Sequence, residues 1–391
     1  MSKLKLLELF GGIGACSRAL DHLGIEYELV DYVEIDKYAC KSFNAIHGTD
    51  FKPQDVKEWD KKVDVDLIMH GSPCQDFSIG GKGKGGNEGS GTRSSLMYET
   101  VRIVSSLKPK YVLWENVKNL LSEKHRYNFD MYLDKMEELG YRNYYQVLNA
   151  KDYGVPQNRE RVFTVSIRKD IKEEFVMPKP FPLDKRLKDL LEDEVDESYY
   201  ISEKMKIAIL GNVVDKNLKD YYDRSKFMFN PSVAYSLCIK PDRRIGDSNY
   251  IIDEYGELNV KEYLKIKNAT KKGYHEAKEG DYINLQFTNS TTRRGRVGEQ
   301  QANTLLTSDE QGVVTKELRI RKLTPRECWR LMGFDDEAFE KAREVNSDTQ
   351  LYKQAGNSIV VDVLEAILTN LLINPHKLEK EQMSMFDFIE R

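Results

Sequence analysis

The sequence predicts an α/β protein, with a doubly wound, mostly parallel sheet and a second, smaller and irregular domain. Two observations predict this fold class. Between residues 4 and 168, short apolar runs of strand length alternate with helical patterns, whereas residues 187–318 are polar and only weakly periodic. Strands that alternate with helices are typical of a parallel sheet whose two faces are both covered by helices.

The predicted elements follow one another along the chain. Strands are predicted at 4–9, 27–34, 63–71, 110–116, 143–150 and 161–168, and helices near 15–23 and 94–107. A proline-rich segment at 177–186 indicates a domain boundary, and an apolar helix at 358–372 is expected to pack back onto the sheet. The resulting divisions are a first domain over 1–180, the irregular domain over 187–318, a hinge with a basic helix over 319–353, a C-terminal helix over 354–375 and a tail over 376–391.

Composition excludes several classes of protein. The 391 residues include 60 basic and 64 acidic side chains, whereas a protein that coats nucleic acid passively is strongly basic. No apolar run reaches the ~18 residues that a membrane helix needs, and the first residues lead into a strand pattern rather than a secretory signal. The five cysteines form no CxxC pair, so we expect a reduced, cytoplasmic chain without a disulfide framework or a metal site.

The segment FGGIG at 10–14, between the first strand and the first helix, has the layout of a nucleotide-binding turn. Its glycines let the backbone approach a ligand, and the helix N-terminus favours negative charge. Glu34 ends the second strand about 20 residues on, where a carboxylate accepts hydrogen bonds from ribose hydroxyls. Asp55 is a candidate for reading an adenine amino group. A purely structural tight turn is the alternative, because the motif is not GxGxxG.

Cys74 is the candidate nucleophile. It lies in GSPCQDFS at 71–78, directly after a predicted strand, and ligands bind at the C-terminal ends of strands in a doubly wound sheet. Pro73 restricts the backbone before it, which favours a nucleophile over a small buried hydrophobic residue. The glycine-rich segment that follows, at 79–95, predicts a mobile lid over the substrate, with a disordered linker as the alternative.

Glu115 ends another predicted strand. A carboxyl group at that buried position has a raised pKa unless it is partnered, which suits acid–base chemistry. A structural salt bridge is the alternative. Arg159 and Arg161 are candidates for its partner, or for binding a phosphate or a base carbonyl.

Together these segments resemble the DNA (cytosine-5) methyltransferases of bacterial or phage type. The matching blocks occur in the family's order at 7–20, 71–78, 115–121, 157–162, 321–334 and 354–367. The resemblance implies the Rossmann-like sheet of S-adenosylmethionine-dependent methyltransferases. In that family the unmatched stretch, 187–318, is the variable target-recognition domain.

The resemblance also implies a mechanism. A cytosine is flipped out of duplex DNA, and the Cys74 thiolate attacks carbon 6 of its ring. Glu115 contacts ring nitrogen 3 and the amino group, while Arg161 holds the base carbonyl with Arg159 close by. Carbon 5 then takes the methyl group of S-adenosylmethionine, a base removes the carbon 5 proton, and Cys74 leaves.

The same resemblance assigns a set of residues to the cofactor site. They are Phe10, Gly12, Gly14, Glu34, Asp55, Pro73, Leu96, Asn357 and Ser358. One position departs from the family's pattern: Glu8 stands where the family usually has Asp. Because Glu is one methylene longer, its contact with the methionine part of the cofactor is expected to differ.

Two basic clusters are candidates for DNA contact. Arg293, Arg294 and Arg296 lie in the irregular domain, and Arg321 and Arg326 lie near the helix that follows it. Phosphate or base contacts are expected for both clusters, although a solvated charged face is the alternative. Thr304, in QANTLLTSD, resembles the Thr of the Thr-Leu pair near the end of the family's recognition domain.

The C-terminal segment from Gln382 to Phe386 resembles the peptide by which bacterial proteins bind the sliding clamp. The alternative is that this apolar tail folds onto its own domain. We expect a monomer that acts on double-stranded DNA and does not associate with membranes.

Three other functions are alternatives to a DNA cytosine-5 methyltransferase. An RNA (tRNA) cytosine-5 methyltransferase shares the chemistry, but the long separate recognition domain favours DNA. A non-catalytic DNA-binding protein has no need for Cys74, Glu115 and Arg161. In a nicotinamide-dependent oxidoreductase, the SPCQ and ENV motifs have no role.

Overall fold

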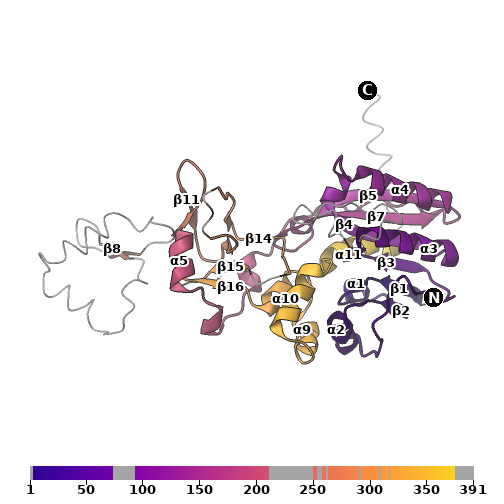
Figure 1. Cartoon of the computed structure of the whole chain (residues 1–391), viewed down its shortest axis with the longest axis horizontal. Coiled ribbons are helices and arrows are strands. Elements are labelled where there is room, and N and C mark those ends of the chain that lie inside the picture. The colour runs from indigo at the N-terminus through magenta and orange to yellow at the C-terminus, as the bar shows by residue number, and fades with distance from the viewer. Residues whose placement is uncertain are drawn as a thin grey trace, which may run out of the picture. The chain divides into compact units, whose positions relative to one another are not determined.

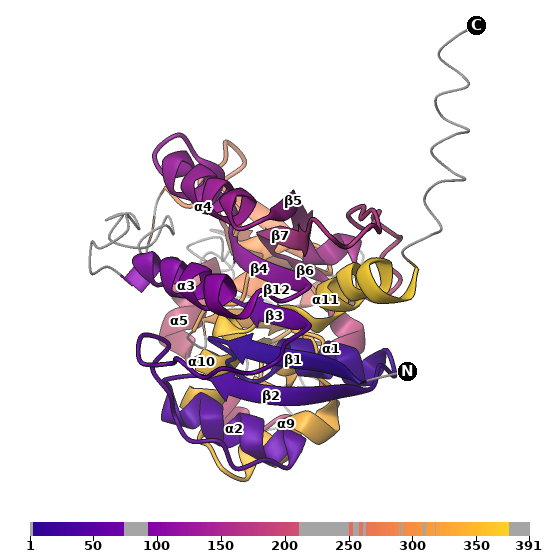
Figure 2. The same ribbon diagram turned by 90° about the vertical axis from the view of Figure 1, so that its right-hand side faces the viewer.

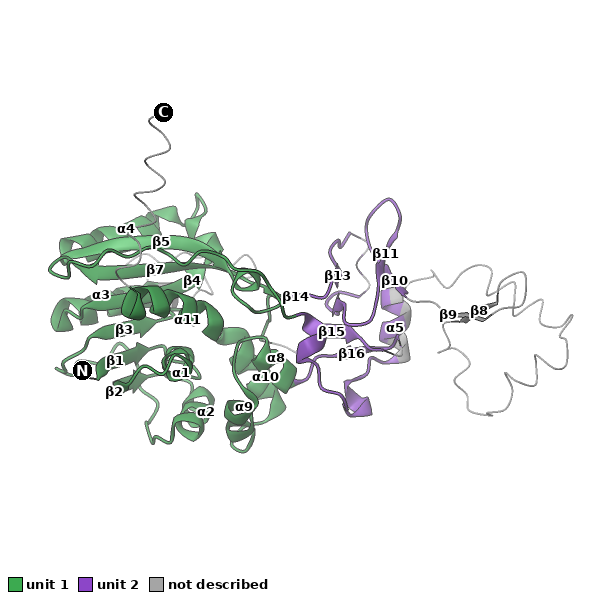
Figure 3. Ribbon diagram, turned by 180° about the vertical axis from the view of Figure 1, so that it is seen from behind, with its two compact units in different colours: residues 1–185, 304–308, 325–391 green, residues 186–303, 309–324 purple. Residues whose placement is uncertain are grey.

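The computed structural model describes residues 3–73, 93–210, 250–252, 258–260, 263–288, 290, 292–307, 310–316 and 318–374. Cys74, most of the predicted lid and the candidate clamp-binding peptide therefore lie outside the described residues. The chain divides into two compact units (Figure 3). The first contains residues 1–185, 304–308 and 325–391, and the second contains 186–303 and 309–324.

The first unit is built on a six-stranded sheet in the order β2-β1-β3-β4-β7-β5 (Figure 1). Its strands are β1 (Leu4–Leu9), β2 (Tyr27–Val33), β3 (Leu67–His70), β4 (Tyr111–Val117), β5 (Tyr141–Asn149) and β7 (Glu160–Arg168). The first four in spatial order are parallel, and β7 pairs antiparallel with both β4 and β5. All four residues of β3 are buried, as expected for a strand covered on both faces. The predicted α/β fold with a mostly parallel sheet is confirmed.

Helices cover both faces of this sheet. Figure 2 shows α3 and α4 on one face and α1 and α11 on the other. The helices of this unit are α1 (Ala15–His22), α2 (Lys37–His47), α3 (Met97–Leu107), α4 (Arg126–Glu138), α8 (Pro325–Arg330), α9 (Asp336–Arg343), α10 (Asp348–Asn357) and α11 (Val361–Leu368). The apolar faces of α3 and α4 join β1, β3 and β4 in one buried cluster, which holds the central strands in place.

The turn between β1 and α1 requires glycine at Gly14. This residue precedes α1 with φ 82°, in the left-handed region that glycine adopts at no steric cost. A Cβ there would also lie 2.6 Å from His47 Nε2 and 2.7 Å from Phe43. The sequence motif therefore has a packing reason, in addition to any ligand that the turn accepts.

The C-terminal helical pattern is interrupted where the sequence predicted a continuous helix at 358–372. Instead α10 ends at Asn357 and α11 begins at Val361, because Val360 is extended and the Val361 N–H donates to the Met332 carbonyl at 3.0 Å. This break leaves Ser358 outside both helices. The prediction was wrong at this boundary.

Counted as one stretch, Asp348–Ile373 is long and apolar enough to cross a membrane, with a mean hydropathy of 1.5. The break at Ser358 divides it, and the apolar side chains of α11, including Leu364 and Ile367, are fully buried. It is a core element of the first unit and does not indicate a membrane protein.

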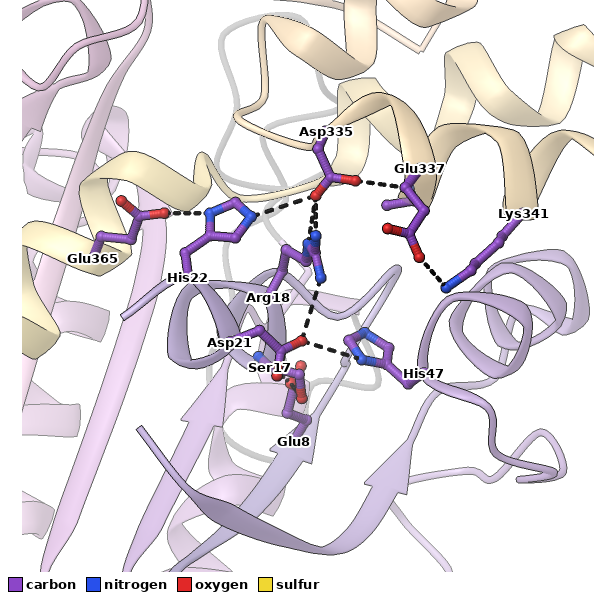
Figure 4. A network of polar contacts seen from close by, with 11 residues as sticks. Glu8, Ser17, Arg18, Asp21, His22, His47, Asp335, Glu337, Lys341 and Glu365 are labelled. Atoms are coloured by element: carbon purple, nitrogen blue, oxygen red, sulfur yellow. Dashed lines mark hydrogen bonds and ion pairs between the residues drawn. The ribbon is translucent and has the colours of Figure 1, made fainter. Parts of the chain in front are cut away.

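A polar network ties α1 to neighbouring helices of the same unit (Figure 4). Arg18 donates through Nε to the Asp335 carboxylate at 2.8 Å, and His22 pairs with Glu365 of α11 at 2.6 Å. Asp335 also accepts from the Ala338 N–H and caps α9. These bonds hold the pKa of Asp335 at about 2 despite its partial burial.

The second unit has a four-stranded antiparallel sheet in the order β13-β12-β15-β16. Its core includes Ile209 of α5 (Glu203–Leu210), Ile266, Ile283 and Val314. The remaining strands are short; they are β6 (Gln157–Asn158) in the first unit, and β8 (Tyr250–Ile252), β9 (Leu258–Val260), β10 (Leu264–Lys267), β11 (Tyr274–Ala277), β12 (Tyr282–Asn284), β13 (Val297–Gly298), β14 (Ala302–Asn303), β15 (Gln311–Val314) and β16 (Ile320–Lys322) in the second.

Candidate active site

A pocket opens at the C-terminal ends of β1, β3 and β4. The β1–α1 turn and the break between α10 and α11 complete its wall. It is lined by Glu8, Leu9, Phe10, Gly11, Gly12, Ile13, Ala15, Cys16, Met69, Gly71, Glu115, Asn357, Ser358 and Ile359. This is the edge at which doubly wound sheets bind ligands. Of the predicted cofactor residues, Phe10, Gly12, Asn357 and Ser358 thus lie together.

Glu34 is bonded directly to the β1–α1 turn. Its Oε2 accepts from the Gly12 N–H at 3.1 Å, and its Oε1 accepts from the Asp36 N–H at 2.7 Å. Burial raises the pKa of Glu34, and these two backbone bonds oppose the shift. The Tyr32 hydroxyl donates to the Gly12 carbonyl at 2.6 Å, which fixes the turn from the other side.

The remaining predicted cofactor residues flank this turn. The Gln54 N–H donates to the Glu34 carbonyl at 2.8 Å, which brings Asp55 next to the end of β2. Phe10 and Leu96 pack against the same apolar cluster. The structure therefore brings an acid, two apolar side chains and a glycine turn to one edge of the sheet.

Glu115 lies at the end of β4 and is only 9% exposed. Its Oε1 is 3.0 Å from Nε of Arg161, which comes from the adjacent strand β7. Burial raises the pKa of Glu115, and the charges of Arg161 and Arg159 act in the opposite direction. The Glu115 carboxyl group is therefore paired with Arg161, and it also lines the pocket.

The chain leading into Cys74 passes beside Glu115. Trp114 Nε1 donates to Ser72 Oγ at 3.0 Å, and Asn116 Nδ2 donates to the Ser72 carbonyl at 3.2 Å. A Cβ on Gly71 would lie 3.9 Å from Glu115 Oε2. These contacts fix the backbone up to Pro73, one residue before the predicted nucleophile.

Arg159, expected close to Arg161, lies near enough to Glu115 for its charge to lower the pKa of that carboxyl group. It is 4% exposed, and its Nη2 donates to the carbonyls of Ser358 at 2.7 Å and Gly356 at 3.2 Å. Its Nη1 donates to the Leu305 carbonyl at 3.4 Å. These bonds connect Arg159 to two backbone segments, at 305 and at 356–358, that are far from it in the sequence.

Gln157 is a buried residue that the sequence did not single out. Its Nε2 donates to the Leu331 carbonyl at 2.6 Å, and its Oε1 accepts from the Leu305 N–H at 3.2 Å. The hydroxyl of Thr304 donates to the Asn158 carbonyl at 2.9 Å. The sequence signal for Gln157 is its position at the start of the QNRER motif, in which only the arginines were predicted to have a role.

The arginines expected to contact DNA fall into different environments. Arg296 is 1% exposed and donates to the carbonyls of Asn284, Gln286, Phe287 and Thr288, while Arg321 is 3% exposed. Both are interior residues of the second unit, which corrects the prediction that they form an open basic face. A buried guanidinium satisfies several carbonyls at once, and an Arg-rich stretch does not reveal this from sequence.

Two other arginines remain accessible. Arg294 is exposed, and Arg293 stacks over the exposed ring of Phe287 at 5.5 Å. Arg326, in the first unit, pairs with Glu340 and Asp336. In the described part of the chain, no group of three or more His, Cys, Asp or Glu side chains is placed to hold a metal ion.

Comparison with known proteins identifies the family. Residues 4–372 match C-5 cytosine-specific DNA methylase. The orphan methyltransferase M.SPRI of Bacillus phage SPR is 35% identical, over 95% of this chain and 98% of that protein. The type II methyltransferase M.HhaI of Haemophilus parahaemolyticus is 30% identical, over 95% of each. The crystal structure of Spodoptera frugiperda DNMT2 shares the fold, with a TM-score of 0.58 at 20% identity over 94% of this chain and 99% of that one.

The chain belongs to the C-5 cytosine-specific DNA methylase family. It is a DNA (cytosine-5-)-methyltransferase of the kind found in restriction–modification systems and their phage relatives.

Glu8, the position that departs from the family's pattern, is a buried carboxyl in the pocket wall. It is 1% exposed, and its Oε1 accepts from the Ser17 N–H at 2.8 Å and from the Ser17 hydroxyl at 2.5 Å. Burial raises its pKa from 4.5 to about 7, and the two Ser17 bonds only partly oppose this shift.

We expect Glu8→Gln to remove a pH dependence of stability. Between pH 4.5 and about 7 the folded chain holds a proton on Glu8 that the unfolded chain has lost. The free energy of unfolding should therefore decrease as pH rises through this window, by about 1.4 kcal/mol per unit of pKa difference. Gln keeps the acceptor for Ser17 without titrating, so the variant should be more stable than the wild type at pH 8.

Urea unfolding at several pH values measures this difference. Glu58→Gln, at an exposed carboxylate, is the matched control and should keep the wild-type slope. If Glu8→Gln kept that slope as well, the assignment to Glu8 would be refuted.

Proposed function

We propose that this enzyme transfers a methyl group from S-adenosylmethionine to carbon 5 of a cytosine flipped out of duplex DNA, through a covalent bond to Cys74. One observation carries the proposal: the buried Glu115–Arg161 pair lies beside the backbone that leads into Cys74. The pair supports the proposal because an acid from β4 and a cation from β7 lie next to the segment, described as far as Pro73, that precedes the candidate nucleophile in the sequence.

The pocket suits S-adenosylmethionine, which has an adenine ring, ribose hydroxyls and an amino-acid part. Phe10 and Leu96 offer apolar surface for the ring, Glu34 has carboxylate oxygens for the ribose, and Asp55 stands near for the adenine amino group. Gly12, Asn357 and Ser358 line the pocket and bring backbone close to the ligand. Gly14 and Pro73 are assigned to the cofactor site by the family resemblance alone. When bound, the cofactor supplies an electrophilic methyl group on a sulfonium.

The chain's own residues would then act on the base. The Cys74 thiolate adds to carbon 6, and the Glu115 carboxyl, whose pKa burial raises, holds a proton towards ring nitrogen 3. Protonation draws electrons from the ring and favours the addition. Carbon 5 becomes nucleophilic and takes the methyl group, after which a base removes the carbon 5 proton and the thiolate leaves.

Arg161 has two tasks in this proposal. Its Nε holds Glu115 at 3.0 Å, and its guanidinium would also hold the carbonyl of the base. In this proposal Arg159 is a buried residue that holds the surrounding backbone in place.

We assign target recognition to the second unit. It contains the exposed Arg294 and the stacked Arg293 and Phe287, which suit contacts with phosphates and bases. Thr304 belongs to the loop that re-enters the first unit between two passages of the second. A tritiated-methyl assay on duplex DNA and on tRNA separates this proposal from RNA methylation.

Bisulfite sequencing of plasmid DNA from cells that express the protein tests the reaction and finds the target sequence in one step. Wild-type protein should protect cytosines in one sequence context. Cys74→Ser should abolish protection, because a hydroxyl at this position is a far weaker nucleophile, while purified variant still binds cofactor and DNA. Substantial protection by Cys74→Ser would exclude the covalent mechanism.

Glu115→Gln should slow single-turnover methyl transfer by about 10²–10⁴-fold, the usual contribution of a positioned acid, with little change in cofactor affinity. Gln fills the same space and can still accept from Arg161, but it cannot hold the transferable proton. Rapid-quench kinetics and calorimetry measure the two quantities. Glu160→Gln, an exposed neighbour paired with Lys118, is the control and should leave both unchanged.

The tail from Gln382 to Phe386 supports a further proposal, on sequence alone, that the enzyme binds a bacterial sliding clamp as a monomer. A pull-down with purified clamp should retain the full chain and lose a chain that ends at Glu381. Equal retention of both would mean that the tail has another role, and light scattering would check the monomer.

A further inference from the structure

The loop at 304–307 is hydrogen-bonded to the first unit through Thr304 and Leu305. Thr304 donates to the Asn158 carbonyl, and the Leu305 N–H donates to Gln157 Oε1 at 3.2 Å. The Leu305 carbonyl accepts from Arg159 at 3.4 Å. Both ends of this loop continue directly into the second unit along the chain.

Gly356 allows the loop to approach α10. A Cβ at this position would lie 2.4 Å from the Leu306 carbonyl oxygen and 2.7 Å from the Thr307 nitrogen. Gly356 lies inside α10, where alanine is intrinsically more favourable than glycine. The glycine is therefore explained by the backbone-to-backbone contact that it permits.

The same guanidinium that holds Leu305 also holds the wall of the cofactor pocket. Arg159 donates to the carbonyls of Gly356 and Ser358, and Ser358 lines the pocket. One planar, charged group thus connects the loop to the turn between α10 and α11. Lysine keeps the charge but cannot present this fork of donors to carbonyls on two segments.

We propose that Arg159 is a positioning residue that couples cofactor binding to DNA binding, through the loop at 304–307. The proposal rests on the function proposed above and adds a regulation to that site. Cofactor binding in the pocket restrains the backbone at Ser358. Because Arg159 bonds to both Ser358 and Leu305, it then also restrains Leu305 and the loop that leads into the second unit. Binding of either ligand then strengthens binding of the other by the same factor, because such coupling is reciprocal.

Two variants interrupt this connection at different atoms. Arg159→Lys removes the fork, and Gly356→Ala pushes the Leu306 backbone away while the Arg159 side chain itself stays unchanged. Their matched controls lie outside the site. Arg142→Lys changes a guanidinium that donates to the carbonyls of Ile171 and Glu173. Gly24→Ala adds a methyl group with no atom within 4 Å but at a φ of 64°, so it shows whether backbone strain and lost stability alone change the coupling.

The first measurement is the dissociation constant of S-adenosylhomocysteine by calorimetry, with and without a duplex that carries the sequence found by bisulfite sequencing. In the wild type the duplex should tighten binding by about 5–150-fold, the usual range of coupling. In Arg159→Lys and Gly356→Ala the factor should approach one, and in both controls it should stay at the wild-type value. The double variant should be no worse than either single variant.

The second measurement is hydrogen exchange at the Leu305 amide without DNA. S-adenosylhomocysteine should slow this exchange in the wild type and leave it unchanged in the two site variants. If Arg159→Lys fails to fold by circular dichroism, Gly356→Ala carries both tests.

The outcomes separate the two proposals. A wild type that does not bind S-adenosylhomocysteine refutes the proposed function. A wild type that binds it without coupling, or variants that lose stability but keep the full coupling factor, refute the role of Arg159 alone.

Discussion

The arrangement of the first unit depends on a guanidinium buried among backbone carbonyls. A buried charge is costly unless several hydrogen bonds satisfy it, and a buried carbonyl is costly without a donor. Arg159 meets both requirements, since it donates to Leu305, Gly356 and Ser358. The residues that it connects lie about 150 to 200 positions further along the chain, so only the folded chain brings them to this guanidinium. Its positive charge also stabilises the ionised form of the Glu115 carboxyl group.

Three carboxyl groups with raised pKa values lie in the wall of the pocket or beside it. Glu8, Glu34 and Glu115 come from β1, the end of β2 and β4, and burial raises the pKa of each. Each has different partners: Ser17 for Glu8, backbone N–H groups for Glu34 and Arg161 for Glu115. Such separate environments allow neighbouring acids to have separate tasks, which is a common feature of active sites. Of these three carboxyl groups, Glu115 is the one that pairs with an arginine and lies beside Gly71, in the segment that leads to the predicted nucleophile.

Sequence patterns predicted the strands well, because a strand buried on both faces must be apolar along its whole length. They also placed Glu34 at the end of the second strand, where the structure bonds it to the glycine turn through the Gly12 N–H. The break at Ser358 was missed, because Ile359 and Val360 continue the apolar pattern and only the external bond from Val361 to Met332 interrupts the helix. Gln157 was missed because a single polar residue gives no periodic signal.

The sequence by itself determined the family and the α/β sheet, because these depend on local patterns and on motifs of fixed spacing; the same motifs also proposed the chemistry-bearing residues. Tertiary structure decided which charged side chains are accessible. Arg296 and Arg294 are two residues apart, yet one is inside the second unit and the other is exposed. It also decided that Arg159 is a support whereas Arg161 faces the carboxyl group. Charge and spacing are local properties, but burial depends on which distant carbonyls the folded chain brings within reach of each guanidinium.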